Sequence, residues 1–184
     1  GFRVEPYLIA RIEDSGGATL FQADPSRACA DCWFRDQHAP AGGGPVTVAA
    51  TREEKPATRV LEPRLAYQMH SMLQDVINAG TGRRARELKR SDLAGKTGTT
   101  NEARDAWFCG YQKDLVTVAW MGFDTPRSLG GSETGAAAAL PMWISYMGVA
   151  LRGMPDVPLA TPEGVVAATI NPETGLRNER TDNR

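Results

Sequence analysis

Three strand-like segments lie close together in the second half of the chain. They cover residues 95–100, 105–111 and 115–123, in which aromatic and β-branched side chains are frequent, and only three or four polar residues separate them. A parallel return between neighbouring strands needs a long crossover, so connections this short favour antiparallel pairing. The segment therefore predicts an antiparallel meander of three strands.

Helical patterns flank this meander on both sides. Residues 63–78 carry apolar side chains at the helical period, with Pro63 suited to the first turn and Gly80 to the C-terminal cap. The apolar positions of this helix are Leu65, Met69, Met72, Leu73, Val76 and Ile77. A second helix is predicted over 136–151, where Pro141 either kinks the helix or lies in the first turn after a break. An antiparallel sheet flanked by helices is an α+β fold.

The rest of the chain gives weaker patterns. Residues 7–13 and 18–22 predict a β-hairpin around a glycine-bearing turn. Residues 23–56 are rich in Ala, Asp, Gly and Pro, which indicates an irregular loop or insertion. Residues 165–170 predict a last strand before a turn at 171–175, and 178–184 form a polar tail.

The charge of the chain excludes some partners. The 184 residues have a net charge of -1 and no basic stripe, so nucleic acid is not an expected partner. A local basic run between Arg83 and Arg90 could attract acidic glycans or lipid headgroups, but a solvated loop is the simpler interpretation. No apolar run is long enough to span a membrane.

Cysteine spacing leaves several possibilities open. Cys29 and Cys32 form a C-x-x-C that could be a redox pair or half a zinc site. No second pair of metal ligands follows, so a loop disulfide or two unpaired thiols is the favoured interpretation. Cys109 lies in an aromatic strand and is expected to be a small buried residue. No metal and no cofactor is expected.

Residues around the meander are given structural roles. Trp107, Trp120 and Trp143 are expected in the core before any ligand-binding role. Arg104 and Asp105 flank a strand and are expected to form a surface ion pair that adds little stability.

A Lys96-Thr97-Gly98 motif opens the first strand of the meander. Lys96 offers a compact cation, and Thr97 and Thr99 alternate around Gly98, so both hydroxyls point to one face of the strand. Gly98 has no Cβ, which lets a substrate backbone approach closely. If the strand is an edge, its free backbone groups can pair with an extended peptide. The alternative is a solvent-facing lysine on a polar strand edge.

The context of this motif resembles a known family. The motif continues as Thr99-Thr100-Asn101, and Gly80-Thr81-Gly82 follows the preceding helix. The strand at 105–111 and the Gly-Ala…Pro-x-Trp helix at 135–143 match as well. The whole pattern resembles the class A penicillin-binding proteins, the bifunctional cell-wall synthases, and most closely their 1A type. The resemblance extends from about residue 7 to residue 177 and is weakest over 23–56.

This resemblance implies the penicillin-binding, serine β-lactamase-like transpeptidase fold. It implies a D,D-transpeptidase that cross-links peptidoglycan through an acyl-enzyme and is inhibited covalently by β-lactams. By analogy Lys96 is catalytic, Thr97, Gly98 and Thr99 bind the substrate, and the Thr99 backbone N–H completes the oxyanion hole. The expected partners are β-lactams and stem peptides ending in D-Ala-D-Ala. The expected location is the periplasmic face of the bacterial inner membrane, with an N-terminal anchor outside this chain.

The nucleophile of this family is absent from the chain. The seven serines lie at 15, 26, 71, 91, 128, 132 and 145, and none has Lys three residues on or Asn two residues on. The S-x-x-K and S-x-N motifs precede K-T-G in the family, so the chain, residues 1–184, is expected to be the C-terminal part of a transpeptidase domain. The missing N-terminal half is then an expected partner, and a glycosyltransferase module is expected further upstream. The isolated chain is predicted to be inactive.

Two alternatives share the same motif. A penicillinase or a β-lactam-sensing receptor would have the same fold, and a peptidoglycan-binding scaffold would keep a degenerate site. The strand at 105–111 and the helix at 135–143 favour the synthase.

Overall fold

The computed structural model describes residues 1–28, 55–171 and 173–177. The predicted C-x-x-C pair, most of the 23–56 insertion and the polar tail at 178–184 lie outside these residues. The chain divides into two compact units, Gly1–Pro63 and Arg64–Arg184, and each is described by itself.

The N-terminal unit contains short antiparallel strands. Its two pairs are β1 (Phe2–Arg3) with β4 (Thr58–Arg59), and β2 (Arg11–Glu13) with β3 (Thr19–Gln22). The predicted hairpin is confirmed, although its first strand begins at Arg11 rather than Tyr7. The Asp14 carboxylate accepts the N–H groups of Gly16 and Ala18 across the turn at 2.9 and 2.8 Å.

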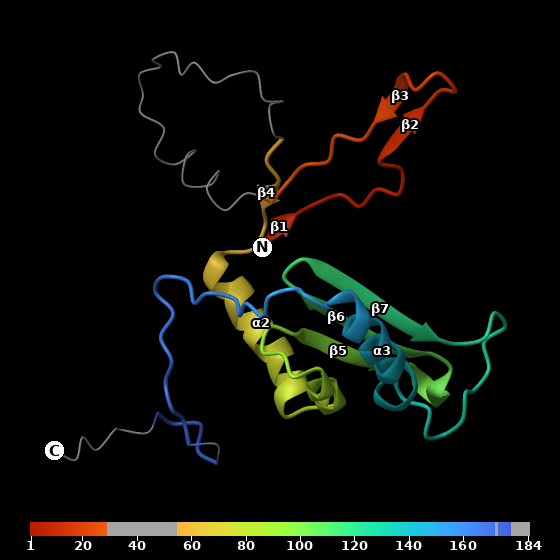
Figure 1. Cartoon of the computed structure of the whole chain (residues 1–184). Helices are drawn as coiled ribbons and strands as arrows, with labels where there is room; N and C mark the ends of the chain where they lie inside the picture. The colour runs from red at the N-terminus through yellow and green to blue at the C-terminus, as the bar shows by residue number, and fades with distance from the viewer. Residues whose placement is uncertain (29–54, 172, 178–184) are drawn as a thin grey trace, which may run out of the picture. The chain divides into compact units, whose positions relative to one another are not determined.

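The second unit, with the helix that leads into it, holds the predicted α+β arrangement. Its elements in chain order are α2 (Pro63–Asn78), η1 (Arg83–Leu88), β5 (Ala94–Thr99), η2 (Asn101–Ala103), β6 (Ala106–Gln112), β7 (Leu115–Met121), η3 (Gly135–Ala139) and α3 (Leu140–Ala150). The strands pair antiparallel in the order β5-β6-β7, which confirms the meander. Figure 1 shows α3 lying along this sheet, with β5 as one of its edges.

The second predicted helix changes its helical type near its start. Residues Gly135–Ala139 form a π-helical turn, and α3 then begins at Leu140 with Pro141 in its first turn. Proline is tolerated there because the first-turn N–H groups have no helical partner. Pro141 therefore lies in the first turn of α3, but the helical residues run on from the π-helical turn without the predicted break.

One face of the sheet packs against α3 and forms the core. Phe108 and Trp143 are fully buried and meet edge to face, with ring centroids 4.9 Å apart. Gly110 makes room for this contact, because a Cβ there would lie 2.6 Å from the Trp143 ring. The indole Nε1–H of Trp143 donates to the backbone oxygen of Thr117 at 3.1 Å, so the buried ring leaves no polar atom unpaired.

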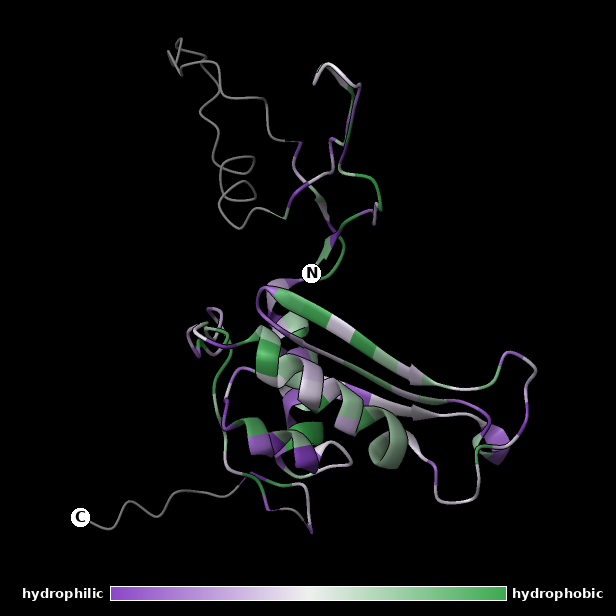
Figure 2. Cartoon of the chain, turned by 45° about the vertical axis from the view of Figure 1, so that its right-hand side comes forward, coloured by the Kyte–Doolittle hydropathy of each residue, from purple (hydrophilic) through white to green (hydrophobic). Residues whose placement is uncertain are grey.

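The opposite face of the sheet, here called the open face, is covered only at one end by the described residues. Trp107 and Trp120 are 37% and 44% exposed, and Cys109 is exposed, so the prediction that these three residues lie in the core is wrong. The register explains the error: Cys109 pairs with Lys96 and Val118, whose side chains point away from α3. Figure 2 shows that β7 is hydrophobic along most of its length.

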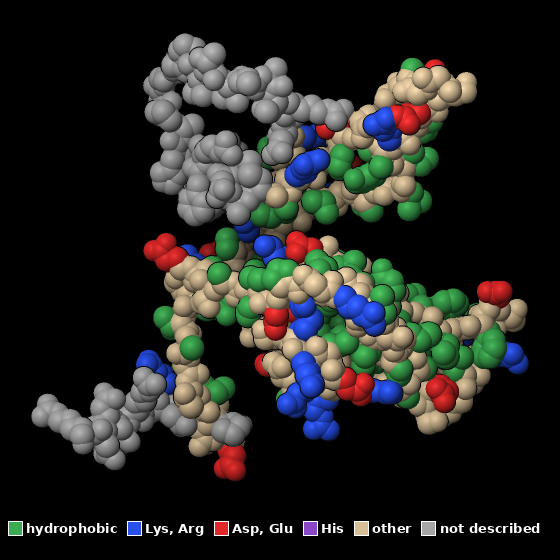
Figure 3. All heavy atoms as spheres, in the orientation of Figure 1, with side chains coloured by type: hydrophobic (Ala, Val, Ile, Leu, Met, Phe, Trp, Pro, Cys, Tyr) green, Lys and Arg blue, Asp and Glu red, His purple; other side chains and the backbone are tan. Residues whose placement is uncertain are grey.

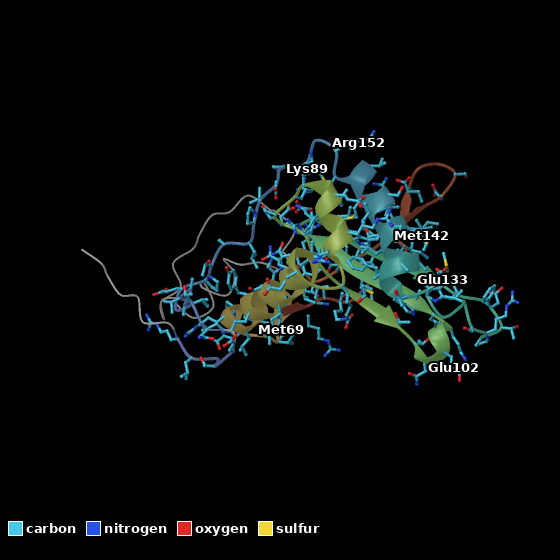
Figure 4. The ribbon with its side chains drawn as sticks, turned by 90° about the horizontal axis from the view of Figure 1, so that it is seen from below. Met69, Lys89, Glu102, Glu133, Met142 and Arg152 are labelled. Carbon is cyan, nitrogen blue, oxygen red and sulfur yellow. The ribbon has the colours of Figure 1, made fainter. Side chains whose placement is uncertain are left out.

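Helix α2 matches its predicted bounds, yet its apolar face is covered only in part. Ile77 is buried, whereas Leu65, Met69 and Met72 are about half exposed. Figure 4 shows Met69 on the outer side of this helix. Several apolar side chains of the second unit therefore have no covering layer among the described residues.

The last predicted strand is wrong. In place of a strand over 165–170 there is a single bridge between Ile170 and Arg177, and Val166 is 85% exposed. Alternation alone does not make a strand when no neighbouring strand supplies hydrogen bonds. The following turn is present, with the Gly175 N–H donating to the Asn171 oxygen at 2.8 Å.

The basic run is more ordered than predicted. Residues Arg83–Leu88 form a 3-10 helix, and Figure 3 shows Lys and Arg side chains gathered over it. Arg90 is different, because its guanidinium turns inward and makes two hydrogen bonds of 2.9 and 2.6 Å to the buried carboxylate of Asp92.

The predicted Arg104–Asp105 pair is wrong. Arg104 pairs instead with Glu102, and the Asp105 carboxylate accepts the indole N–H of Trp120 at 3.0 Å.

Within residues 1–28, 55–171 and 173–177, no helix is both long and apolar enough to cross a membrane. The same residues contain no cluster of His, Cys, Asp and Glu that could hold a metal ion.

Candidate active site at the edge of strand β5

The backbone of β5 offers free hydrogen-bonding groups along its outer edge. Beyond the strand end, the Thr100 N–H donates to the Asp105 oxygen at 3.1 Å. Because alternate residues of an antiparallel strand bond to the same neighbour, the peptide groups of Thr97 and Thr99 point away from β6. In the described part of the chain no strand pairs with this edge.

The Lys96 side chain reaches this edge. Its Cβ faces the open side of the sheet, opposite Cys109 in register. The long side chain bends round the strand, and the ammonium Nζ donates to the Thr97 oxygen at 2.9 Å. Lys96 is exposed, so the two remaining ammonium protons are available to a ligand.

The two threonine hydroxyls lie on the other face of β5, in the alternation that their spacing predicts. The Thr97 hydroxyl is 2.8 Å from the hydroxyl of Thr81, which follows α2. The Thr99 hydroxyl accepts the Gly135 N–H at 2.9 Å, at the start of η3. Each hydroxyl is therefore held by a different element.

Glycine allows η3 to pack directly on the strand backbone. A Cβ on Gly135 would lie 2.3 Å from the backbone oxygen of Trp107 and 2.5 Å from that of Gly98. Only a residue without a Cβ lets this turn approach closely enough for its N–H to reach Thr99. In Figure 4, Glu102 marks η2 and Glu133 marks the loop before η3.

Buried polar contacts fix the start of β5. Burial disfavours the charged form of Asp92, yet hydrogen bonds from Arg90, Gln112 and the Val157 N–H together hold the pKa of this carboxyl below its ordinary value. Arg90 also donates to the backbone oxygens of Met154 and Pro155 at 2.9 and 2.7 Å. The segment after α3 is thereby tied to the sheet.

A histidine from α2 covers the same end of the open face. His70 Nδ1 lies 3.0 Å from the Tyr111 hydroxyl, and burial lowers the pKa of His70. This contact joins α2 to β6.

The assembled edge offers an ammonium, two hydroxyls and outward peptide groups. This set can bind a carboxylate and pair with an extended peptide. Sequence reasoning found Lys96, Thr97 and Thr99 but gave no role to Thr81 or Gly135. The only sequence signal for these two was their place in glycine-bearing segments that flank the motif.

Known proteins match this chain strongly. Residues 1–140 match the model of the penicillin-binding protein transpeptidase domain. Penicillin-binding protein 1A of Pseudomonas aeruginosa is 47% identical over 95% of the chain, and that of Neisseria lactamica is 41% identical over 91%. The chain spans 24% and 18% of the length of these two relatives.

A solved structure agrees with the sequence matches. The 2.6 Å crystal structure of penicillin-binding protein 1A from Haemophilus influenzae matches with a TM-score of 0.81 and 38% identity. The match covers 98% of this chain and 28% of that protein. The chain therefore belongs to the transpeptidase domain family of the penicillin-binding proteins, and its relatives are of the 1A type.

Proposed function

We propose that this chain supplies the substrate-binding strand of a D,D-transpeptidase cleft in a bifunctional cell-wall synthase. This strand is β5, which carries the K-T-G motif. The observation that carries the proposal is a free strand edge with the Lys96 ammonium bent onto the Thr97 backbone oxygen and with the Thr97 and Thr99 hydroxyls along the adjoining face. These groups suit the terminal carboxylate of a peptide, and the free edge suits its extended backbone.

In this proposal a stem peptide ending in D-Ala-D-Ala lies antiparallel to β5. Its carboxylate accepts hydrogen bonds from the threonine hydroxyls and interacts with Lys96. The outward N–H of Thr99 donates to the oxygen of the scissile carbonyl as negative charge develops on it. A β-lactam presents a carboxylate and a strained amide to the same groups.

The attacking serine comes from outside this chain. Its hydroxyl oxygen adds to the penultimate D-Ala carbonyl, and its proton passes to a base and then to the departing D-Ala amine. The amine of a second stem peptide then attacks the acyl-enzyme ester and releases the serine. The S-x-x-K and S-x-N half of the domain would supply the serine and its base, as the missing partner of this chain.

The open face of the sheet supports the proposal that another part of the protein supplies the serine and its base. Trp107, Val118 and Trp120 leave much of their apolar surface in solvent, which a partner layer would bury. Since the chain spans about a quarter or less of its relatives, we place that layer, a glycosyltransferase module and an N-terminal membrane anchor in the rest of the protein. The proposed location is the periplasmic face of the inner membrane.

The test uses fluorescent penicillin and denaturing gels. We expect the full-length protein to be labelled and to release the label slowly, and the isolated chain to remain unlabelled. Lys96→Ala should lower the acylation rate of the full-length protein about a hundredfold, because one preorganised charge is lost. Lys113→Ala, an exposed lysine in the turn between β6 and β7, is the matched control and should change nothing. Labelling of the isolated chain, or rapid release of label, would contradict the proposal.

A further inference from the structure

We infer that Thr81 is a positioning residue of the carboxylate site, holding the Thr97 hydroxyl in the orientation that meets the substrate. The inference rests on the proposed function and adds a residue to it. Thr81 lies outside the K-T-G motif and is brought to it by the loop that ends α2. Its hydroxyl oxygen is 2.8 Å from that of Thr97, well within hydrogen-bond distance.

The loop that carries Thr81 is firmly anchored. The Gly80 N–H donates to the Asp75 oxygen at 3.0 Å, and the Gly82 N–H donates to the Val76 oxygen at 2.9 Å. A Cβ on Gly80 would lie 2.9 Å from the Val76 Cα, so the chain wraps tightly against the helix end. The Thr81 side chain is therefore presented to β5 by backbone contacts on both sides of it.

A count of protons shows what the pair can do. Two hydroxyls that share one hydrogen bond use one of their two protons, so one O–H donor remains for a ligand. At Thr99 the oxygen accepts the Gly135 N–H, so the hydroxyl proton is again left to donate. Whichever of Thr81 and Thr97 donates, one O–H of the pair stays free, and the Thr99 hydroxyl proton stays free as well. Because Thr81 and Thr99 are exposed, a carboxylate can reach these donors.

The expected effect is specific to ligands that carry the carboxylate. Without Thr81, the Thr97 hydroxyl loses its fixed partner and rotates among its rotamers, so its donor is no longer preorganised. A ligand whose carboxylate is esterified offers this donor only a weaker, uncharged acceptor and should respond much less. A merely structural role of Thr81 would slow the reaction of both ligands to the same extent.

The experiment measures second-order acylation rate constants of the full-length protein with benzylpenicillin and with its methyl ester. We expect Thr81→Ala to lower the rate with benzylpenicillin about fivefold to tenfold, the size of one hydrogen bond, and the rate with the ester less than about twofold. Thr81→Ser keeps the hydroxyl and should restore the rate. Thr161→Ala is the matched control, since Thr161 forms a similar 3.0 Å hydroxyl pair with Tyr67 away from the motif.

Several results would overturn the role inferred for Thr81. Equal losses with the acid and the ester, no loss with either, or a failure of Thr81→Ser to restore the rate would overturn the inference. A wild-type protein that reacts with neither compound would overturn the proposed function, and this inference with it. Melting temperatures of the variants show whether a lower acylation rate comes from misfolding. If Thr81→Ala misfolds, the acylation rates of Thr81→Ser are compared with those of the wild type instead.

Discussion

The two faces of the β5-β6-β7 sheet differ in how completely this chain covers them. On one face Phe108 and Trp143 are fully buried beneath α3. On the other, Trp107 and Trp120 meet each other at 5.9 Å between ring centroids but keep much of their surface in solvent. Among the residues that the structure describes, these strands thus have a buried core on one side and exposed apolar side chains on the other.

This difference agrees with the proposal that another layer covers the open face. The covered face holds η3 and α3 against the strand backbone and so fixes Thr99 through Gly135. The open face carries Lys96 at one edge and the exposed tryptophans beside it. A transpeptidase cleft needs both a substrate-binding wall and a nucleophile, and we place the nucleophile in the layer that covers the open face.

The largest expected effect is a difference in stability between variants of the buried Trp143 and of the partly exposed Trp120. Trp143→Ala should lower the free energy of unfolding of the chain by about 4 kcal/mol, because it leaves a cavity beneath α3. Trp120→Ala removes a half-exposed ring and one hydrogen bond to Asp105, so about 1 kcal/mol is expected. Urea unfolding of both variants makes the comparison. Equal losses would show that the open face is a core in its own right.

The next largest loss of stability is expected at the Arg90–Asp92 pair, which joins the sheet to the segment after α3. Asp92→Asn should cost about 3 kcal/mol at pH 7, since it leaves the inward-facing Arg90 without its carboxylate. The pKa of Asp92 lies below its usual 3.8 in the folded chain, so the unfolded chain takes up the proton first as the pH falls. The stability from this pair is therefore complete above pH 3.8 and is lost as the pH falls through the folded pKa. A gap between wild type and variant that stays constant into strong acid would contradict this account.

A smaller effect is expected where η3 touches the strand. Gly135→Ala would place a Cβ against two backbone oxygens, which cannot move aside as a flexible side chain can, and should cost about 2 kcal/mol. Gly131→Ala is the matched control, because a Cβ there meets nothing within 4 Å. Thermal unfolding of both variants tests the contact. If the two variants have the same melting temperature, the close approach of η3 is not real.

The smallest effect concerns the one end of the open face that α2 covers. Burial lowers the pKa of His70 below its ordinary 6.5, so the unfolded chain binds the proton more readily than the folded chain. Stability should therefore fall as the pH drops below 6.5 and continue to fall down to the folded pKa. His70→Gln should weaken this dependence between pH 7.5 and 5.5 while still offering Tyr111 a hydrogen-bond partner. An unchanged pH profile would show that His70 is not the group involved.

The sequence predicted the helices and strands better than it predicted which of their faces are buried. Short connections determined the antiparallel meander, and Pro63 and the apolar period determined the bounds of α2, because these signals are local. Alternation could not tell which face of a strand is covered by the same chain, so Cys109 and Trp120 were misassigned to the core.

The candidate site was predictable only where a motif carried it. Lys96, Thr97 and Thr99 were found through K-T-G. Thr81 and Gly135 were assigned no role because their contacts with β5 join residues 16 and 36 positions apart in the sequence. Contacts of this kind depend on tertiary packing and leave no local pattern.

The most direct test of the central claim is to map where penicillin becomes attached. The full-length protein is labelled, digested and analysed by mass spectrometry, with coverage of the peptides that contain Lys96 and all seven serines of this chain. We expect the acyl group on a serine outside residues 1–184 and every peptide of this chain unmodified. An acyl group on any serine of this chain would contradict this expectation.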